Sequence, residues 1–143
     1  MRLYRRLLLT ATVLAFAVIA LGAYVRLSDA GLGCPDWPGC YGHWLGVPDE
    51  MHEQLAAQQA YPDRPVETGK AWKEMVHRYF AGTLGLLILA ICLLAWRPEF
   101  RKRQSPALPT LLLAVVSLQA ALGMWTVTLL LKPLIVTLHL LGG

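Results

Sequence analysis

The stretch WKEMVHRYFAGTLGLLILAICLLAW, residues 72–96, decides the fold of this chain. A tryptophan stands at each end, and the apolar run inside it continues to Leu94. A helix needs about 20 apolar residues to cross a hydrocarbon core of about 30 Å, so the stretch predicts a transmembrane helix. His77 lies near its start. Because ionisable side chains are costly within a bilayer, His77 is a candidate functional residue.

Three more apolar runs accompany this one, at about 7–24, about 107–127 and 133–143. The first two are long enough to span a membrane, whereas the last, beginning at Pro133, would reach only about 16 Å at ~1.5 Å per residue. We therefore predict an all-α integral membrane bundle with three full transmembrane helices and the start of a fourth. Residues 1–143 are expected to form one half-domain of a longer protein.

The charges fall between the apolar blocks, which is the pattern of a membrane protein and not of a soluble domain. Basic residues gather at the N-terminus and in one short loop: Arg2, Arg5, Arg6, Arg97, Arg101, Lys102 and Arg103. This asymmetry predicts a multi-pass protein of a bacterial-type inner (cell) membrane, with a cytoplasmic N-terminus and an outside loop at about 25–71. A signal peptide is the alternative for the first run, but the poor cleavage site at Leu21-Gly22-Ala23 favours an uncleaved helix.

A second histidine, His139, lies about six residues after Pro133, or about 9 Å along a helix. His77 lies about five residues after Trp72, so the two depths agree within one turn. Neutral imidazoles at matched depth suit the two axial positions of a heme iron, whereas zinc or copper normally requires further ligands. The alternative is a helix–helix seam in which His77 is hydrogen-bonded to Glu74 or to a neighbouring helix.

Several other residues could contribute to such a site. Glu74 precedes His77 by three residues, so the two share a helix face, which the small residues Ala81 and Gly85 continue. Arg26 and Arg78 stand at the outer interface, where either can bind a heme propionate or simply face solvent and headgroups. On the 107–127 run, Gln119 and Gly123 are expected to face the bundle, with Gln119 in an interhelical hydrogen bond.

The outside loop contains Cys34 and Cys40, which bracket Pro-Asp-Trp-Pro-Gly. Two close cysteines on the oxidising side of a membrane most simply form a disulfide. A metal site with His43 and a redox-active pair are the alternatives. Cys92 is expected to be a core residue. Residues 49–60 predict a short amphipathic interfacial helix with Met51, Leu55 and Gln58 or Gln59 on one face.

Four segments, in this order, resemble the N-terminal half of heme A synthase: GAYVRLSDAGLGCPDWPGC (22–40), EMVHR (74–78), WTV (125–127) and TLHLL (137–141). The resemblance implies an eight-helix protein of two similar four-helix bundles, each placing two histidines around a heme. Its activity would oxidise a ring methyl of heme O to the formyl group of heme A, for use in cytochrome c oxidase.

The resemblance also assigns roles. His77 and His139 match the histidine pair associated with heme O, and Glu74 matches an acidic residue implicated in catalysis. Cys34 and Cys40 match loop cysteines found in many members. A heme b cofactor is expected in the second bundle, outside these residues.

Three function classes follow. The first is a heme A synthase-type oxidoreductase whose partners are the bilayer, heme O and heme A, and also heme O synthase and oxidase assembly proteins, with no nucleic acid. The second is a membrane electron-transfer module with a permanent bis-histidine heme. The third is a structural assembly factor without heme.

Overall fold

The computed structural model describes residues 2–143, and it is helical with no strand in that range. Its six helices are α1 (Arg2–Leu27), α2 (Met51–Ala60), α3 (Thr68–Ala95), α4 (Pro98–Arg101), α5 (Ala107–Thr128) and α6 (Pro133–Gly142). Three of them, α1, α3 and α5, are long and apolar enough to cross a membrane. The prediction of an all-α membrane bundle is therefore confirmed.

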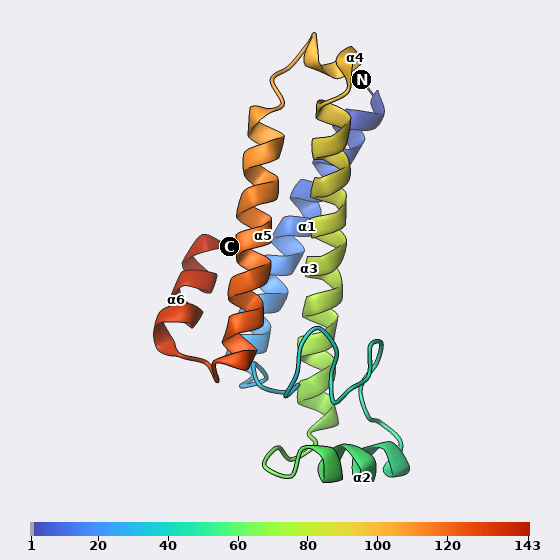
Figure 1. Ribbon diagram of the computed structural model, residues 1–143, viewed down its shortest axis with the longest axis vertical. Helices are drawn as coiled ribbons and strands as arrows, with labels where there is room; N and C mark the ends of the chain where they lie inside the picture. The colour runs from blue at the N-terminus through green and yellow to red at the C-terminus, as the bar shows by residue number, and fades with distance from the viewer. Residues whose placement is uncertain (1) are drawn as a thin grey trace.

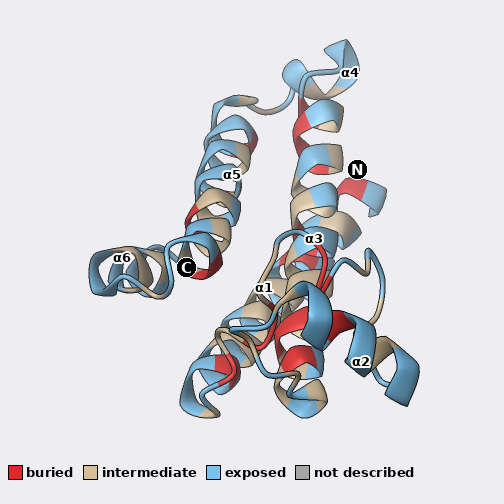
Figure 2. Cartoon of the chain, turned by 60° about the horizontal axis from the view of Figure 1, so that its bottom comes forward, coloured by how far each residue is buried: buried red, intermediate tan, exposed pale blue. Residues whose placement is uncertain are grey.

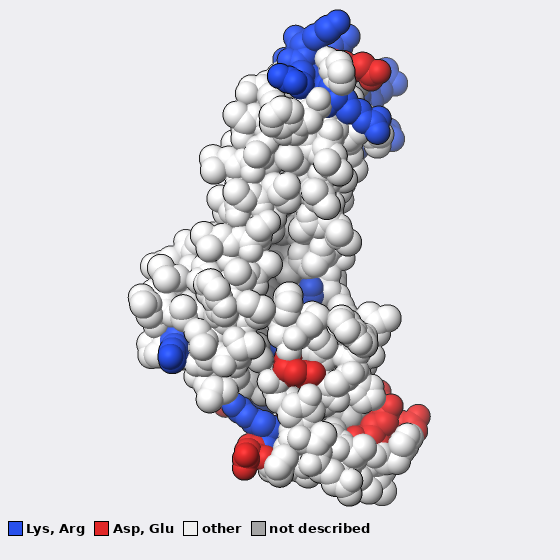
Figure 3. All heavy atoms as spheres, viewed as in Figure 1, with Lys and Arg blue, Asp and Glu red and all other residues white. Residues whose placement is uncertain are grey.

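The long helices run alternately up and down, so the connections gather at two opposite ends of the bundle (Figure 1). The chain start and α4 lie at one end, while α2 and the loop that precedes it lie at the other. Lysine and arginine side chains crowd the end that carries α4 (Figure 3). This arrangement agrees with the charge asymmetry of the sequence, because both basic segments occupy the same end.

The helices match the predicted spans closely: α1 and α5 contain theirs, while α3 and α6 each end one residue before the predicted end. α1 begins at Arg2 and α3 at Thr68, in each case several residues before the apolar run. Backbone hydrogen bonding continues past the membrane surface, which explains why hydropathy alone misplaced these ends. The short helix α4, which starts at Pro98, was not predicted.

The helices pack in series, with α1 on α3, α3 on α5 and α5 on α6. The α1–α3 seam is built around Tyr4, Ala11, Leu84, Ile91 and Ala95. Buried residues concentrate along α3 and beneath the outside loop, and α6 has none (Figure 2). The many exposed leucines on the long helices are what a lipid-facing surface requires.

A second core holds the outside loop and α2 against the start of α3. It consists of Cys34, Cys40, Tyr41, Val47, Ala57, Ala71 and Met75. The predicted helix at 49–60 is present as α2, but its inward side chain is Ala57, whereas Met51 and Leu55 are 80% and 61% exposed. Met51 and Leu55 therefore do not pack within the described chain, and the placement of their face at the membrane interface stays a prediction.

Candidate functional site

The imidazole of His77 lies directly against α1 at Gly22. A β-carbon built on Gly22 would stand 3.0 Å from Cε1 and 3.5 Å from Nε2 of the ring. Carbon atoms in ordinary contact are about 3.5–4.0 Å apart, so a side chain at this position would displace the ring. Glycine at position 22 thus allows α3 to present His77 close to α1.

The second imidazole has the same arrangement on another pair of helices. His139 of α6 lies against Gly123 of α5, where a β-carbon would be 3.3 Å from Cε1 and 3.5 Å from Nε2. Pro133 is the first residue of α6, as predicted, since it needs no amide hydrogen there. Each histidine therefore lies against a glycine of a neighbouring spanning helix, His77 against α1 and His139 against α5.

Both imidazoles have a nitrogen that the protein leaves without a partner. The Nδ1 atoms of His77 and His139 are buried, and no residue within 2–143 forms a hydrogen bond with either. Buried polar atoms are nearly always satisfied, so an unsatisfied Nδ1 on each of the two rings makes both histidines candidates for binding a ligand. The alternative in which Glu74 bonds the His77 ring is not observed, whereas a hydrogen bond to a neighbouring helix stays open, since the ring lies near the Val18 backbone of α1.

These residues fit a heme better than a free metal ion. Within residues 2–143 no group of three or more histidine, cysteine or acidic side chains could hold a metal. A porphyrin supplies four nitrogens to its iron, so two imidazoles suffice as axial ligands. That both rings converge on one iron stays a prediction.

Glu74 is deeply buried, with 4% of its surface exposed, and both carboxylate oxygens have partners. Its Oε1 is 2.5 Å from Nη2 of Arg78, and its Oε2 accepts a hydrogen bond of 3.0 Å from the Cys34 amide. The Glu74 carboxylate therefore links α3 to the outside loop that carries Cys34 and Cys40.

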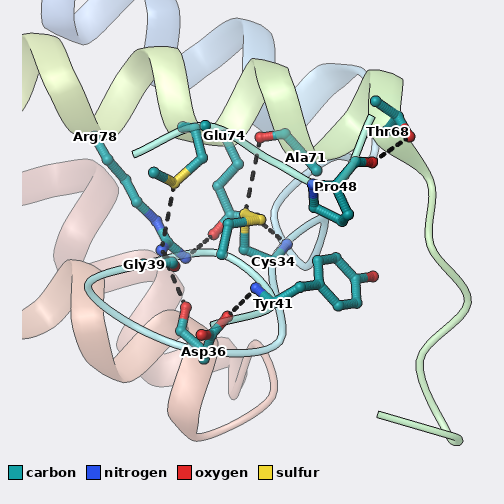
Figure 4. The surroundings of a disulfide bond; sticks show 12 residues. Cys34, Asp36, Gly39, Tyr41, Pro48, Thr68, Ala71, Glu74 and Arg78 are labelled. Atoms are coloured by element: carbon teal, nitrogen blue, oxygen red, sulfur yellow. Dashed lines mark hydrogen bonds and ion pairs between the residues drawn. A yellow bond between two sulfur atoms is a disulfide. The ribbon is translucent and has the colours of Figure 1, made fainter. Parts of the chain in front are cut away.

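Arg78 continues this connection into the loop. Its Nη1 donates toward the backbone carbonyls of Asp36 (3.0 Å), Pro38 (3.2 Å) and Gly39 (2.5 Å). Figure 4 shows the guanidinium lying between Glu74 and the loop backbone. Both terminal nitrogens of Arg78 thus have partners within the protein, and binding of a propionate by Arg78 stays a prediction. Nothing in the sequence spacing signalled contacts to residues about 40 positions upstream.

Arg26 differs from Arg78, since it is exposed in the last turn of α1 and forms no ion pair within residues 2–143. It lies four residues after Gly22, one turn along the helix that contacts His77. The prediction of a propionate partner therefore stays open for Arg26.

Gln119 lies beside Gly142, but its amide oxygen is buried without a partner, so that oxygen makes no interhelical hydrogen bond.

Cys34 and Cys40 form the predicted disulfide, with their α-carbons 4.8 Å apart and both residues completely buried. Their sulfurs bond to each other, which rules out the metal-site alternative with His43. His43 instead pairs with Cys40 through the backbone. Cys92 is free and buried, as expected of a core residue.

Tyr41, which follows Cys40 of the disulfide, links the outside loop to the segment before α3. Its hydroxyl donates to the Pro65 carbonyl at 2.9 Å, and burial, reinforced by the Glu67 carboxylate, raises the pKa of the phenol. Asp36 accepts backbone hydrogen bonds from Tyr41 and Gly42 at 2.6 and 2.8 Å. These hydrogen bonds tie the segment bridged by the disulfide to the residues that follow it and to Pro65.

Comparison with known proteins identifies the family. The family model described as "Cytochrome oxidase assembly protein" (COX15-CtaA) matches residues 5–143. Heme A synthase of Shewanella oneidensis is 54% identical over 132 residues, which are 92% of this chain and 38% of that protein. Heme A synthase of Geobacillus thermodenitrificans is 30% identical over 80% of this chain and 31% of its own length.

A protoheme IX farnesyltransferase of Halobacterium salinarum is 27% identical over 78% of the chain and 20% of its own length. No solved structure gives a significant match. The chain thus spans well under half the length of these relatives. The resemblance noted in the sequence is confirmed, and the chain belongs to the COX15-CtaA family of cytochrome oxidase assembly proteins.

Proposed function

We propose that this chain acts in heme A biosynthesis as the part of a heme A synthase that binds heme O, whose ring methyl is oxidised to a formyl group. Two relatives carry the name heme A synthase, and the family is one of cytochrome oxidase assembly. The observation that carries the proposal is the pair of buried imidazoles, each unpartnered at Nδ1 and each resting on a glycine of a neighbouring helix.

In this proposal His77 and His139 hold the substrate iron from opposite sides, and Arg26 binds a propionate at the outer interface. Neutral imidazole is the form that ligates iron. A heme b cofactor is assigned to a second bundle outside these residues. The chain lies in the cell membrane with its N-terminus in the cytoplasm, and the disulfide loop lies outside.

Glu74 is the proposed catalytic residue. Oxidising a methyl to a formyl group removes electrons and protons and adds oxygen, so a fixed carboxylate nearby can stabilise positive charge or accept a proton. Glu74 shares the outer end of α3 with His77, three residues away. Its two partners, Arg78 and the Cys34 amide, hold it in one orientation.

One observation also favours the second function class, a bis-histidine electron-transfer module. A simple electron carrier does not need a buried carboxylate for its chemistry. The contacts of Glu74 with Arg78 and Cys34, however, give this carboxylate a structural role that an electron carrier could also use. Heme ligation would then proceed without oxidation of the substrate.

The partners we propose are heme O synthase and assembly proteins of cytochrome c oxidase. A segment similar to this chain occurs in a protein named for farnesyl transfer to protoheme, which supports delivery of the substrate by that class of reaction.

The experiment that separates the two functions uses the complete protein in membranes. Glu74→Gln preserves shape and removes charge, so it should retain heme O and lose most of the conversion to heme A. His77→Ala should instead lower the amount of bound heme. The heme O to heme A ratio and the total heme are measured after extraction. Normal heme A production by Glu74→Gln would reduce Glu74 to a structural residue.

A further inference from the structure

The ring closed by the Cys34–Cys40 disulfide presents several backbone carbonyls to one cation. The carbonyls of Asp36, Pro38 and Gly39 all accept from Nη1 of Arg78. All three residues belong to the bridged segment, and the Asp36 carboxylate fixes that segment through the amides of Tyr41 and Gly42. The ring is therefore a preformed socket for a guanidinium.

Arg78 uses its other terminal nitrogen on a single acidic group, Glu74. The two side chains are 12% and 6% exposed, so this ion pair is shielded from water. Breaking a buried ion pair from one side leaves an uncompensated charge, which either moves or is neutralised. The position and charge of Glu74 thus depend on Arg78, and the position of Arg78 depends on the ring.

From these contacts we infer that Arg78 is a positioning residue, held by the carbonyl socket of the disulfide ring, that fixes the Glu74 carboxylate for the oxidation. The inference rests on the proposed function of Glu74. The disulfide then has a structural role, because it acts on the reaction through Arg78 and not through its own redox chemistry. Both cysteines are fully buried, which suits that role.

If Arg78 instead bound a heme propionate, replacing it would have a different effect. A propionate ligand contributes to substrate binding, so its loss lowers the amount of bound heme. A positioning residue contributes to the reaction, so its loss leaves heme bound and slows conversion. Bound heme and conversion rate therefore have to be measured on the same sample.

The test uses the complete protein in membranes with the variants Arg78→Gln, Arg78→Lys, Glu74→Gln and the double variant Glu74→Gln/Arg78→Gln. Arg78→Gln should retain heme O and lower conversion on the order of 100-fold, the typical effect of a small misplacement of a catalytic group. Arg78→Lys should recover part of the rate, since lysine keeps the charge but not the planar fork. It also serves as the test variant should Arg78→Gln fail to accumulate.

The double variant shows whether Arg78 acts through Glu74. If it does, the double variant should be no slower than Glu74→Gln alone, because residues acting as one unit are not additive. Lys73→Gln is the matched control, since Lys73 stands on the same helix but lies over the Tyr24 ring, 5.3 Å from its centre. It should convert heme O at the unaltered rate.

A second measurement does not depend on activity. Arg78→Gln should let a water-soluble phosphine reduce the Cys34–Cys40 bond faster, because the ring loses its bound guanidinium. An unchanged reduction rate would overturn the inference, as would loss of bound heme in Arg78→Gln or multiplicative losses in the double variant. A fully active Glu74→Gln would overturn the proposed role of Glu74, while the reduction rate would still decide whether Arg78 holds the ring.

Discussion

Replacing Gly22 with alanine tests whether the His77 ring must occupy its observed position. The new β-carbon would stand 3.0 Å from Cε1 of the imidazole. Restoring an ordinary carbon contact of about 3.5–4.0 Å would require the ring or α1 to move by roughly 0.5–1 Å. The equivalent change at Gly123 is milder, because the distance to Cε1 of His139 is 3.3 Å.

The cost can be expressed as a loss of heme affinity. Inserting a methyl group into a packed site typically costs about 1–3 kcal/mol, which corresponds to roughly a 5- to 150-fold weaker affinity. We expect Gly22→Ala in the upper part of this range and Gly123→Ala near its lower end. Gly82→Ala is the matched control, because Gly82 is exposed on α3 and a β-carbon there would meet nothing within 4 Å.

The assay measures heme O bound per purified complete protein over a range of heme concentrations, together with its absorption spectrum. The expected order of affinity loss is Gly22→Ala, then Gly123→Ala, with Gly82→Ala unchanged. Unaltered affinity and spectrum in Gly22→Ala would refute the view that His77 ligates heme from this position. A loss in Gly82→Ala as large as that in Gly22→Ala would show a general effect on helix packing instead.

Three further predictions concern the outside loop. Cys34 and Cys40 should resist a membrane-impermeant maleimide in intact cells until reductant and denaturant are both added, because both are fully buried; labelling without reductant would contradict the disulfide. An alkaline phosphatase fusion after Gly46 should be active and one after Arg103 inactive, since the basic segment belongs in the cytoplasm; the reverse pattern would invert the topology. The raised pKa of Tyr41 means that its phenol should ionise above the ordinary value of about 10, so the loop's stability holds below that pH and falls as pH rises through the folded pKa. Near-ultraviolet phenolate absorbance should show this late ionisation, and Tyr41→Phe should reduce it without removing it, because burial also raises the pKa of Tyr61.

The transmembrane architecture could be predicted from sequence because a spanning helix is defined by the length and apolarity of one continuous segment. Spans such as residues 72–96 are recognised by length and lack of charge, whatever their neighbours. The matched depths of His77 and His139 stay a prediction of the same kind, since distance along a helix follows from residue count. The ends of α1 and α3 could not be predicted, because polar residues continue a helix outside the bilayer.

The roles of the charged residues were harder to predict. Arg78 was expected at a headgroup or propionate, and its carbonyl partners lie in a loop whose path depends on the disulfide and on Asp36. A guanidinium bound by backbone carbonyls leaves no signature in residue types, because every residue has a carbonyl. The glycines at 22 and 123 were equally hard to recognise, since their value depends on which helix lies opposite.

The serial packing of the helices has a mechanical consequence. Within residues 2–143, α6 touches only α5, and α5 reaches α1 only through α3. The separation of His77 and His139 therefore depends on two helix contacts in series, α3 on α5 and α5 on α6, with a loop contact of Gly31 beside Leu131. Small rotations at the two helix contacts would add at the histidines, so the distance between them is more sensitive to helix packing than the distance across either contact alone.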